Sequence, residues 1–261
     1  MSKNKLTILV VVASLVALAG CESRKPTFSS NRVYTKKIEN DAGKILRVAQ
    51  EDVANLVGAL FGTPDEPFML ADDALGVSDV LNVDNLAVAA GPITRDNYGL
   101  GKGLYRQHCV HCHGITGDGK GPTASFLNPY PRDFRPGWFK FKSTPIGSKP
   151  TDEDLTRIIR QGIEGTAMPS FSASLSAGEI DAIADYVRYL SIRGETERKL
   201  LFYQANESSY EEGNDEANKA ARAELENYEL VSEILGEVLS SWSSAEEEAT
   251  EIEERSSAYD R

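Results

Sequence analysis

Apolar residues recur every three or four positions in several parts of the chain, a spacing typical of helices that bury one face. The first such part predicts a helix that begins at Asn40 or Asp41 and runs to about Phe61, where the sequence GTPDEP stops it. Its apolar stripe consists of Ile45, Ala49, Val53, Leu56, Val57 and Leu60. Residues 22–97 are therefore predicted as an extension with one amphipathic helix, preceded by a polar tether over residues 22–37.

Two further helices are marked by capping boxes, in which an N-terminal hydroxyl and a carboxylate three residues later bind free backbone amides. Thr151 with Asp154 forms one such pair, and Ser176 with Glu179 forms the other. Residues 114–150, between the cysteines and these helices, are rich in Gly and Pro and predict few regular elements. The helix after Ser176 has the apolar stripe Ile180, Ile183, Ala184, Val187 and Leu190.

The C-terminal extension, residues 195–261, predicts one long amphipathic helix over about residues 216–243. Its apolar residues are spaced by three or four, with most glutamates on the other face: Ala221, Leu225, Tyr228, Val231, Leu235, Val238 and Trp242. About 15 residues at the end are polar and acidic, and we expect them to be disordered.

Charge is distributed unevenly along the 261 residues, whose formal net charge is −12. Residues 98–194 hold 12 Lys and Arg against 9 Asp and Glu, whereas residues 195–261 hold 6 against 19. The acidity therefore belongs to the C-terminal extension, and residues 98–194 are slightly basic. A chain of this overall sign is not expected to bind nucleic acid.

The N-terminus has the pattern of a secretory signal peptide. Two lysines precede an apolar run of 14 residues from Leu6 to Ala19. A membrane-spanning helix needs about 20 residues, and the shorter run has the size of a secretory apolar region. Only Thr7 and Ser14 are polar within it, so a core helix with one polar face fits less well. We expect export to the periplasmic side of a cell envelope.

Cys21 ends this N-terminal segment in the sequence LAGC, which resembles the bacterial lipoprotein box. The resemblance implies that residues 1–21 hold the signal and that Cys21 becomes the lipidated first residue of the mature protein. The alternative is a signal peptide cut near the same place, which leaves Cys21 as a free thiol in an oxidising compartment. Lipidation removes that liability, so we expect a lipid anchor that holds the protein on a membrane.

The candidate chemistry is concentrated in RQHCVHCHG, residues 106–114, which holds Cys109, Cys112 and all three histidines. A structural zinc site needs four ligands, usually from two separated pairs, and one short loop supplies this geometry poorly. A thioredoxin-like dithiol follows a strand in a βαβ unit, and no such strand is predicted. A covalent haem fits better, because in C-x-x-C-H both cysteines form thioethers and the next residue, His113, is placed to bind iron.

A second axial ligand would have to come from elsewhere in the chain. Met168 lies between a glycine turn and a proline, outside any helical stripe, and is the candidate we favour. Met69 has apolar neighbours and is predicted to pack in the core. His108 and His111 lie too close to the attachment site to reach the other haem face. Ligation by His113 and Met168 would raise the reduction potential, as it does in cytochromes c.

Residues 98–194 resemble a single-haem class I cytochrome c. The resemblance rests on C-x-x-C-H and on Gly101 and Tyr105 in the short helix before it, and it places the matching contacts of the last helix at Tyr186 and Tyr189 or at Val187 and Leu190. It implies an all-α fold of small helices around one covalent haem c, with helical extensions at both ends. It also implies that the first and last helices cross at Gly101, where the missing side chain allows close approach.

The resemblance further implies roles for single residues around the haem. In GITGDGKGP, the carbonyl of Pro122 would accept a hydrogen bond from Nδ1 of His113 and fix the ring. In PRDFRPGWFKFKSTP, Arg135, Trp138 or Lys142 would meet the haem propionates. The alternative for this second run is that its aromatic residues wall the core.

Iron with two protein ligands has no free position for a substrate, so we expect transfer of single electrons and not an enzyme reaction. The expected donor and acceptor are redox proteins of a bacterial respiratory chain, such as an oxidase, a reductase or another cytochrome, with no small-molecule substrate. One alternative is a haem subunit of a larger oxidoreductase complex. Others are a haem enzyme or gas sensor, if Met168 is not a stable ligand, and an envelope protein whose extensions bind partners.

Overall fold

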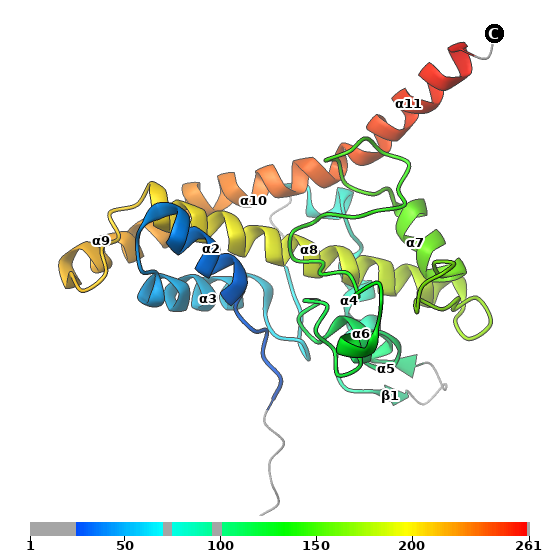
Figure 1. Ribbon diagram of the computed structural model, residues 1–261, viewed down its shortest axis with the longest axis horizontal. Helices are drawn as coiled ribbons and strands as arrows, with labels where there is room; N and C mark the ends of the chain where they lie inside the picture. The colour runs from blue at the N-terminus through cyan, green and yellow to red at the C-terminus, as the bar shows by residue number, and fades with distance from the viewer. Residues whose placement is uncertain (1–24, 70–74, 96–100, 260–261) are drawn as a thin grey trace, which may run out of the picture.

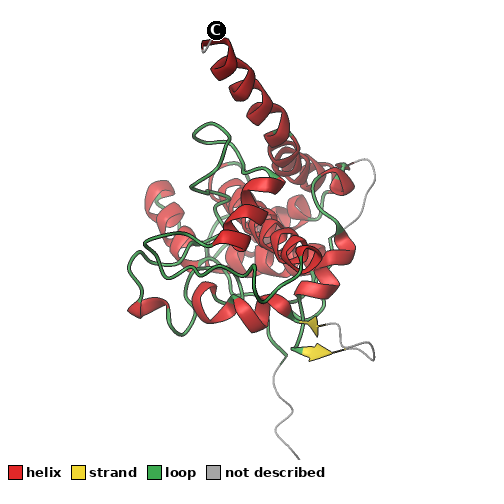
Figure 2. Cartoon of the chain, turned by 90° about the vertical axis from the view of Figure 1, so that its right-hand side faces the viewer, coloured by secondary structure: helices red, strands yellow, loops and turns green. Residues whose placement is uncertain are grey.

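The computed structural model describes residues 25–69, 75–95 and 101–259, and their fold is all-α (Figure 1). Cys21 and the expected signal peptide lie outside the described residues. In the described part, β1 (Thr94–Arg95) and β2 (Gly101–Lys102) form one short antiparallel pair, drawn in yellow in Figure 2. No helix within these ranges combines the length and the apolar run that crossing a membrane requires.

The helices that the structure describes are joined by connections of very different length, the longest of them between Phe126 and Asp152. In order, they are α2 (Arg32–Ala42), α3 (Arg47–Phe61), the 3-10 turn η2 (Val77–Asp79), α4 (Val83–Ala89), α5 (Leu104–His108), α6 (Val110–His113), the 3-10 turn η3 (Ala124–Phe126), α7 (Asp152–Gln161), α8 (Ala177–Asn206), α9 (Asp215–Leu225), α10 (Tyr228–Ser243) and α11 (Ala245–Tyr259).

Helix α8 is the axis of the molecule, and α2, α3, α4, α5, α7 and α10 all contact it (Figure 1). The predicted capping box of Ser176 and Glu179 begins this 30-residue helix. Most of its side chains are buried on every side, as in a helix surrounded by others. It continues past residue 194 without a break, so the cytochrome-like segment and the C-terminal extension share one helix.

The N-terminal extension contains two helices where the apolar pattern predicted one. Asn40 and Asp41, expected to cap the helix, lie instead in the last turn of α2, which Gly43 ends in the left-handed region at φ 64°. Residues 32–37 of the expected tether also belong to α2, because the side chain of Asn31 accepts a hydrogen bond from the backbone and caps the helix start.

Helix α3 ends at Phe61, as predicted, but begins only at Arg47. Ile45, the first residue of the predicted stripe, precedes this start and is 60% exposed. The pattern could not show the break, because the helical spacing continues across it. The buried residues of α3 are Ala49, Val53, Val57, Leu60 and Phe61.

The C-terminal extension also differs from its prediction. The single helix expected over residues 216–243 is two helices, because Asn227 interrupts it and caps α10 by accepting from the backbone N of Glu229. The end expected to be disordered forms α11, which Figure 1 shows extending away from the other helices. Three glutamates in its first turn favour this helix through its dipole, and Ala245 at its start is buried.

A row of buried rings joins the cysteine-bearing segment to α8 and to the N-terminal extension. The rings of Tyr105 and Tyr186 lie 4.9 Å apart, those of Tyr186 and Tyr189 lie 5.5 Å apart, and Phe61 lies 5.9 Å from Tyr189. The predicted contact between Tyr105 and the last helix is therefore confirmed. Gly101 is not at a helix crossing, because it pairs in the short strand β2.

Candidate haem-binding site

The residues predicted to attach a haem lie on one turn of chain at the junction of α5 and α6. The backbone N of Cys109 donates to Tyr105 at 2.8 Å, and the carbonyl of Cys109 accepts from the backbone N of His113 at 2.9 Å. Cys112 and His113 belong to α6. Both cysteines are free thiols and half-buried. The structure therefore brings the two cysteines and the histidine together as predicted.

The glycine-rich segment that follows wraps back over this turn. The backbone N of Gly121 donates to the carbonyl of Cys112 at 3.0 Å, and the hydroxyl of Thr123 donates to the carbonyl of His111 at 2.7 Å. A Cβ atom at Gly121 would lie 2.4 Å from the carbonyl oxygens of Val110 and His111. The absence of a side chain at this position thus allows the close approach that locks the turn.

A mostly apolar cavity of about 600 Å³ opens beside the turn, and Cys109, Cys112, His113 and Met168 all line it. Its volume lies within the range of about 300–1,000 Å³ that is usual for ligand sites. Helices α7 and α8 and the loop of residues 127–141 supply most of the remaining wall, including Leu155, Ile159, Ile183, Val187 and Phe134. The four residues predicted to hold a haem therefore share one apolar cavity.

His113 is held so that one ring nitrogen is used and the other is left for a metal. Its Nδ1 lies 3.0 Å from the carbonyl oxygen of Arg132. Because a carbonyl only accepts, Nδ1 carries the proton and Nε2 keeps its lone pair. The ring also stacks on Phe134, with centroids 4.6 Å apart. Burial lowers the pKa of His113, which favours the neutral imidazole that metals bind.

This arrangement corrects the expected role of Pro122. Pro122 is exposed, in a turn whose backbone groups are already bonded to the attachment turn. Arg132 lies 19 residues from His113 in the chain, and its carbonyl approaches Nδ1 because the loop of residues 127–141 crosses beside the ring.

Met168 lies in a loop that folds back on the end of α7. Its carbonyl accepts from the backbone N of Ile163 at 3.1 Å, and its backbone N donates to Oγ1 of Thr166 at 3.1 Å. A Cβ atom at Gly162 would lie 2.7 Å from the Met168 carbonyl, so the turn needs a glycine there. The backbone of Met168 is fixed on both sides, while its side chain is half-buried on the cavity wall.

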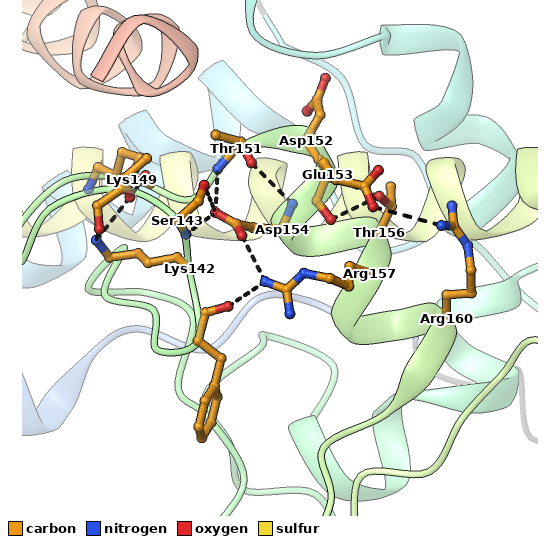
Figure 3. Close-up of polar contacts among 12 residues, drawn as sticks. Lys142, Ser143, Lys149, Thr151, Asp152, Glu153, Asp154, Thr156, Arg157 and Arg160 are labelled. Atoms are coloured by element: carbon orange, nitrogen blue, oxygen red, sulfur yellow. Dashed lines mark hydrogen bonds and ion pairs between the residues drawn. The ribbon is translucent and has the colours of Figure 1, made fainter. Parts of the chain in front are cut away.

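The start of α7 is fixed by Asp154, whose polar contacts are shown in Figure 3. Its carboxylate accepts from the backbone N of Ser143 at 2.8 Å, from the Ser143 hydroxyl at 2.9 Å and from Arg157 at 2.8 Å. Thr151 completes the predicted capping box. Burial alone would raise the pKa of Asp154, but these hydrogen bonds outweigh burial and lower it. Asp154 thus anchors the helix that leads to Met168.

The thiols of the turn differ from those of a redox dithiol. Burial, with a smaller effect of Cys112, raises the pKa of Cys109 to about 12. A dithiol that exchanges disulfides needs a lowered thiol pKa. Within the described residues, no group of three or more His, Cys, Asp and Glu side chains is arranged to hold a metal ion. Neither the dithiol nor the zinc alternative is supported by this geometry.

None of the residues expected at the haem propionates lines the cavity. Arg135 is 3% exposed and pairs with Asp133 at 2.7 Å. Lys142 donates to the hydroxyl of Thr144 at 2.9 Å. Trp138 is 62% exposed.

The cationic side chains that do line the cavity are Arg132 and Lys140, from the same run of sequence. No sequence pattern pointed to these two residues, because the side chains that an irregular loop turns inward depend on its tertiary path. Phe134 and Phe139 line the cavity too, as the alternative reading of this run expected.

The family model of cytochrome c oxidase, cbb3-type, subunit III, matches residues 96–187. The matched segment contains the C-x-x-C-H motif and Met168. This part of the chain is similar to a c-type cytochrome domain. The similarity points to a covalently bound haem c and to haem-based electron transfer.

None of the curated proteins matches the chain. Among solved structures, the Kuenenia stuttgartiensis reducing HAO-like protein complex Kustc0457/Kustc0458 is 33% identical, with a TM-score of 0.33. The similarity covers 38% of this chain and 43% of that chain, so this protein spans less than half the length of the chain it matches.

Proposed function

We propose that the chain is a membrane-anchored c-type cytochrome that carries single electrons between partners of a bacterial respiratory chain. In this proposal, Cys109 and Cys112 would attach one haem c, and His113 and Met168 would bind its iron. The observation that carries the proposal is the placement of these four side chains on the wall of one apolar cavity. When bound there, the haem would supply one-electron chemistry.

The residues of the cavity fit that group. Nε2 of His113 keeps its lone pair because Nδ1 is bonded to the Arg132 carbonyl. Hydrogen bonds of its backbone N and its carbonyl fix Met168 in its loop. None of these bonds uses the thioether sulfur, so the sulfur stays available to a metal. If His113 and Met168 both bound the iron, no position would be left for a substrate, and the apolar wall of the cavity would exclude water.

Charge supports a protein partner with an acidic surface. Arg132 and Lys140 line the cavity, and residues 98–194 carry more basic than acidic side chains. Opposite charge on two partners speeds their encounter and orients it. The proposed anchor is a lipid on Cys21, which follows a segment with the pattern of a signal peptide.

A second candidate function is that of a haem subunit in a larger oxidoreductase complex. The matching family model describes a subunit of a cytochrome c oxidase, and the extensions at both ends offer surface for other subunits. Purification from native membranes in mild detergent distinguishes the two functions. A carrier should be purified without other proteins, whereas a subunit should be purified together with the same partner proteins each time.

The central test compares two methionine variants of the full chain. In Met168→Leu, we expect the haem to stay attached, the potential to fall, and the weak long-wavelength band of methionine–iron bonding to disappear. Met69→Leu is the matched control, because Met69 is 5% exposed in the core and does not line the cavity. It should leave both properties unchanged.

Three outcomes would overturn parts of the proposal. A native protein whose mass shows no added tetrapyrrole ends it altogether. An unchanged potential in Met168→Leu shows that another residue is the ligand. Rapid carbon monoxide binding by the ferrous native protein supports the alternative of a haem enzyme or gas sensor.

A further inference from the structure

Four aromatic rings contact one another in a row that begins at His113, the proposed iron ligand, and ends at Trp242 in the C-terminal extension. His113 stacks on Phe134 with centroids 4.6 Å apart and an interplanar angle of 18°. Phe134 stacks on Phe139 at 6.0 Å and 10°. Phe139 in turn meets the ring of Trp242 edge-on at 5.8 Å and 76°. Trp242 belongs to α10, which lies outside the segment matched by the cytochrome model.

The last ring of this stack is itself fixed from several sides. Trp242 is 4% exposed, and its indole Nε1 donates to the carboxylate of Glu195 at 2.9 Å. Glu195 also pairs with Lys149, whose Nζ lies 5.6 Å from the centroid of the Trp242 ring. The indole is therefore locked by a hydrogen bond at one edge and by a cation above its face.

The orientation of the His113 ring depends on two contacts. The hydrogen bond from Nδ1 to the Arg132 carbonyl fixes one edge of the imidazole, and stacking on Phe134 fixes its plane. Phe134 also packs against Phe139, and Phe139 packs in turn against Trp242. Both phenylalanines also line the cavity, so a shift of either would alter the haem surroundings.

We propose that Trp242 is a positioning residue for the axial histidine, so that the C-terminal extension completes the haem site. The role rests on the proposed covalent haem with His113 as ligand. Trp242 does not line the cavity. It acts through Phe139 and Phe134, which hold the imidazole plane in one orientation about its bond to iron.

The test uses the full-length holoprotein and the variant Trp242→Leu, which keeps an apolar side chain but removes the ring. In the oxidised protein, the spread of the haem-methyl resonances in proton NMR reports the orientation of the axial ligands. We expect Trp242→Leu to shift these resonances and to lower the reduction potential with the haem still attached. Trp242→Phe keeps a ring in the stack and should restore most of the native pattern.

The matched control is Leu235→Ala, which removes another buried side chain of α10. It should lower the melting temperature while leaving the haem-methyl pattern unchanged, because Leu235 is not in the ring stack. Native resonances and potential in Trp242→Leu would overturn the proposal, as would equal shifts in Leu235→Ala.

If Trp242→Leu yields no folded protein, Phe139→Leu breaks the same stack one ring nearer to His113. An unchanged haem-methyl pattern in that variant equally overturns the proposal. A native protein without bound haem would overturn the proposed function and this role together, whereas a haem-loaded protein that is insensitive at Trp242 overturns only the role of Trp242.

Discussion

The candidate haem cavity and the interface between the cytochrome-like segment and its extensions differ in how much charge they bury. The cavity wall is mostly apolar, with residues such as Ile183 and Val187 of α8. Beyond Gly194, the same helix carries buried carboxylates: Glu197 is 1% exposed, and the side chain of Glu195 is 13% exposed. The interface also buries apolar side chains, such as Leu200 and Leu201 of the same helix, but it adds the two carboxylates to them.

Each of the two carboxylates holds a different extension. Glu197 accepts from the backbone N of Asn31 at 2.7 Å and pairs with Arg193 at 3.5 Å. Glu195 accepts from Trp242 at 2.9 Å. Two steps along an α-helix turn the side-chain direction by about 200°, so that the two side chains point to nearly opposite sides. Glu195 and Glu197 therefore reach extensions on opposite sides of α8. The difference teaches that buried charge on α8 adds to apolar packing where the extensions join, whereas the cavity wall relies mainly on apolar packing.

The strongest way to break the interface is to remove Glu197. Glu197→Ala leaves Arg193 buried at 4% exposure with no carboxylate partner and frees the backbone N of Asn31. Removing one member of a buried ion pair costs about 3–5 kcal/mol. We expect a loss of this size in the free energy of unfolding, measured with denaturant on the full chain.

Two matched variants sharpen that measurement. Glu237→Ala removes a carboxylate from the more exposed pair with Lys199 and should cost less than about 1 kcal/mol. The double variant Arg193→Met with Glu197→Leu should be more stable than Glu197→Ala, because no unpaired charge remains buried. Equal costs for Glu197→Ala and Glu237→Ala would contradict the role given to buried charge.

Gly194 lies on α8 where the cavity wall ends and the interface with the extensions begins, and its close packing against Arg135 can be tested by substitution. A Cβ atom there would lie 2.4 Å from Cα of Arg135 and 2.7 Å from its carbonyl oxygen. Overpacking of this kind costs about 1–3 kcal/mol, so Gly194→Ala should lower the free energy of unfolding by that amount. Gly178→Ala, near the start of the same helix, meets no atom within 4 Å. It should be neutral or stabilising by up to about 1 kcal/mol.

Local signals were enough to predict the elements that depend on few neighbouring residues. The capping boxes at Thr151 and Ser176 are confirmed, because each is specified within three positions. The contact of Nδ1 of His113 with Arg132 was missed, because it joins groups 19 residues apart in a loop without periodic pattern. Sequence spacing also could not show that α8 has neighbours on nearly every side.

Helix breaks were missed for a related reason. The apolar spacing from Ala221 to Trp242 continues through the interruption at Asn227, so the pattern alone predicts one helix. The interruption is caused by a cap, and Asn in a helical pattern is a weak signal beside seven regularly spaced apolar residues.

The carboxylates of the two regions should respond to pH with opposite sign. Burial raises the pKa of Glu195 in the interface, and its contacts with Lys149 and Trp242 offset this only in part. The pKa of Asp154, in the cytochrome-like segment, is lowered because its hydrogen bonds outweigh burial. The contribution of Glu195 to stability is therefore lost as the pH rises through its raised pKa. That of Asp154 is lost as the pH falls through its lowered pKa.

The measurement compares Glu195→Gln and Asp154→Asn with the native chain by denaturant unfolding between about pH 3 and pH 8. Asp154→Asn should cost about 1–2 kcal/mol at neutral pH, as loss of a capping carboxylate does, and less in acid. Relative to the native chain, Glu195→Gln should instead gain stability as the pH rises. The same sign of pH dependence in both variants would show that burial does not dominate at Glu195.

The smallest effect is expected where the two extensions touch each other directly and charge is exposed. Arg222 of α9 donates to both carboxylate oxygens of Asp52 in α3, each at 3.0 Å. Because Arg222 is half exposed, water and salt screen the pair. We expect Arg222→Ala to lower the melting temperature by less than about 3 °C, and less still in high salt. A drop as large as that of Glu197→Ala would mean that the extensions are held mainly by each other and not by the buried acids of α8.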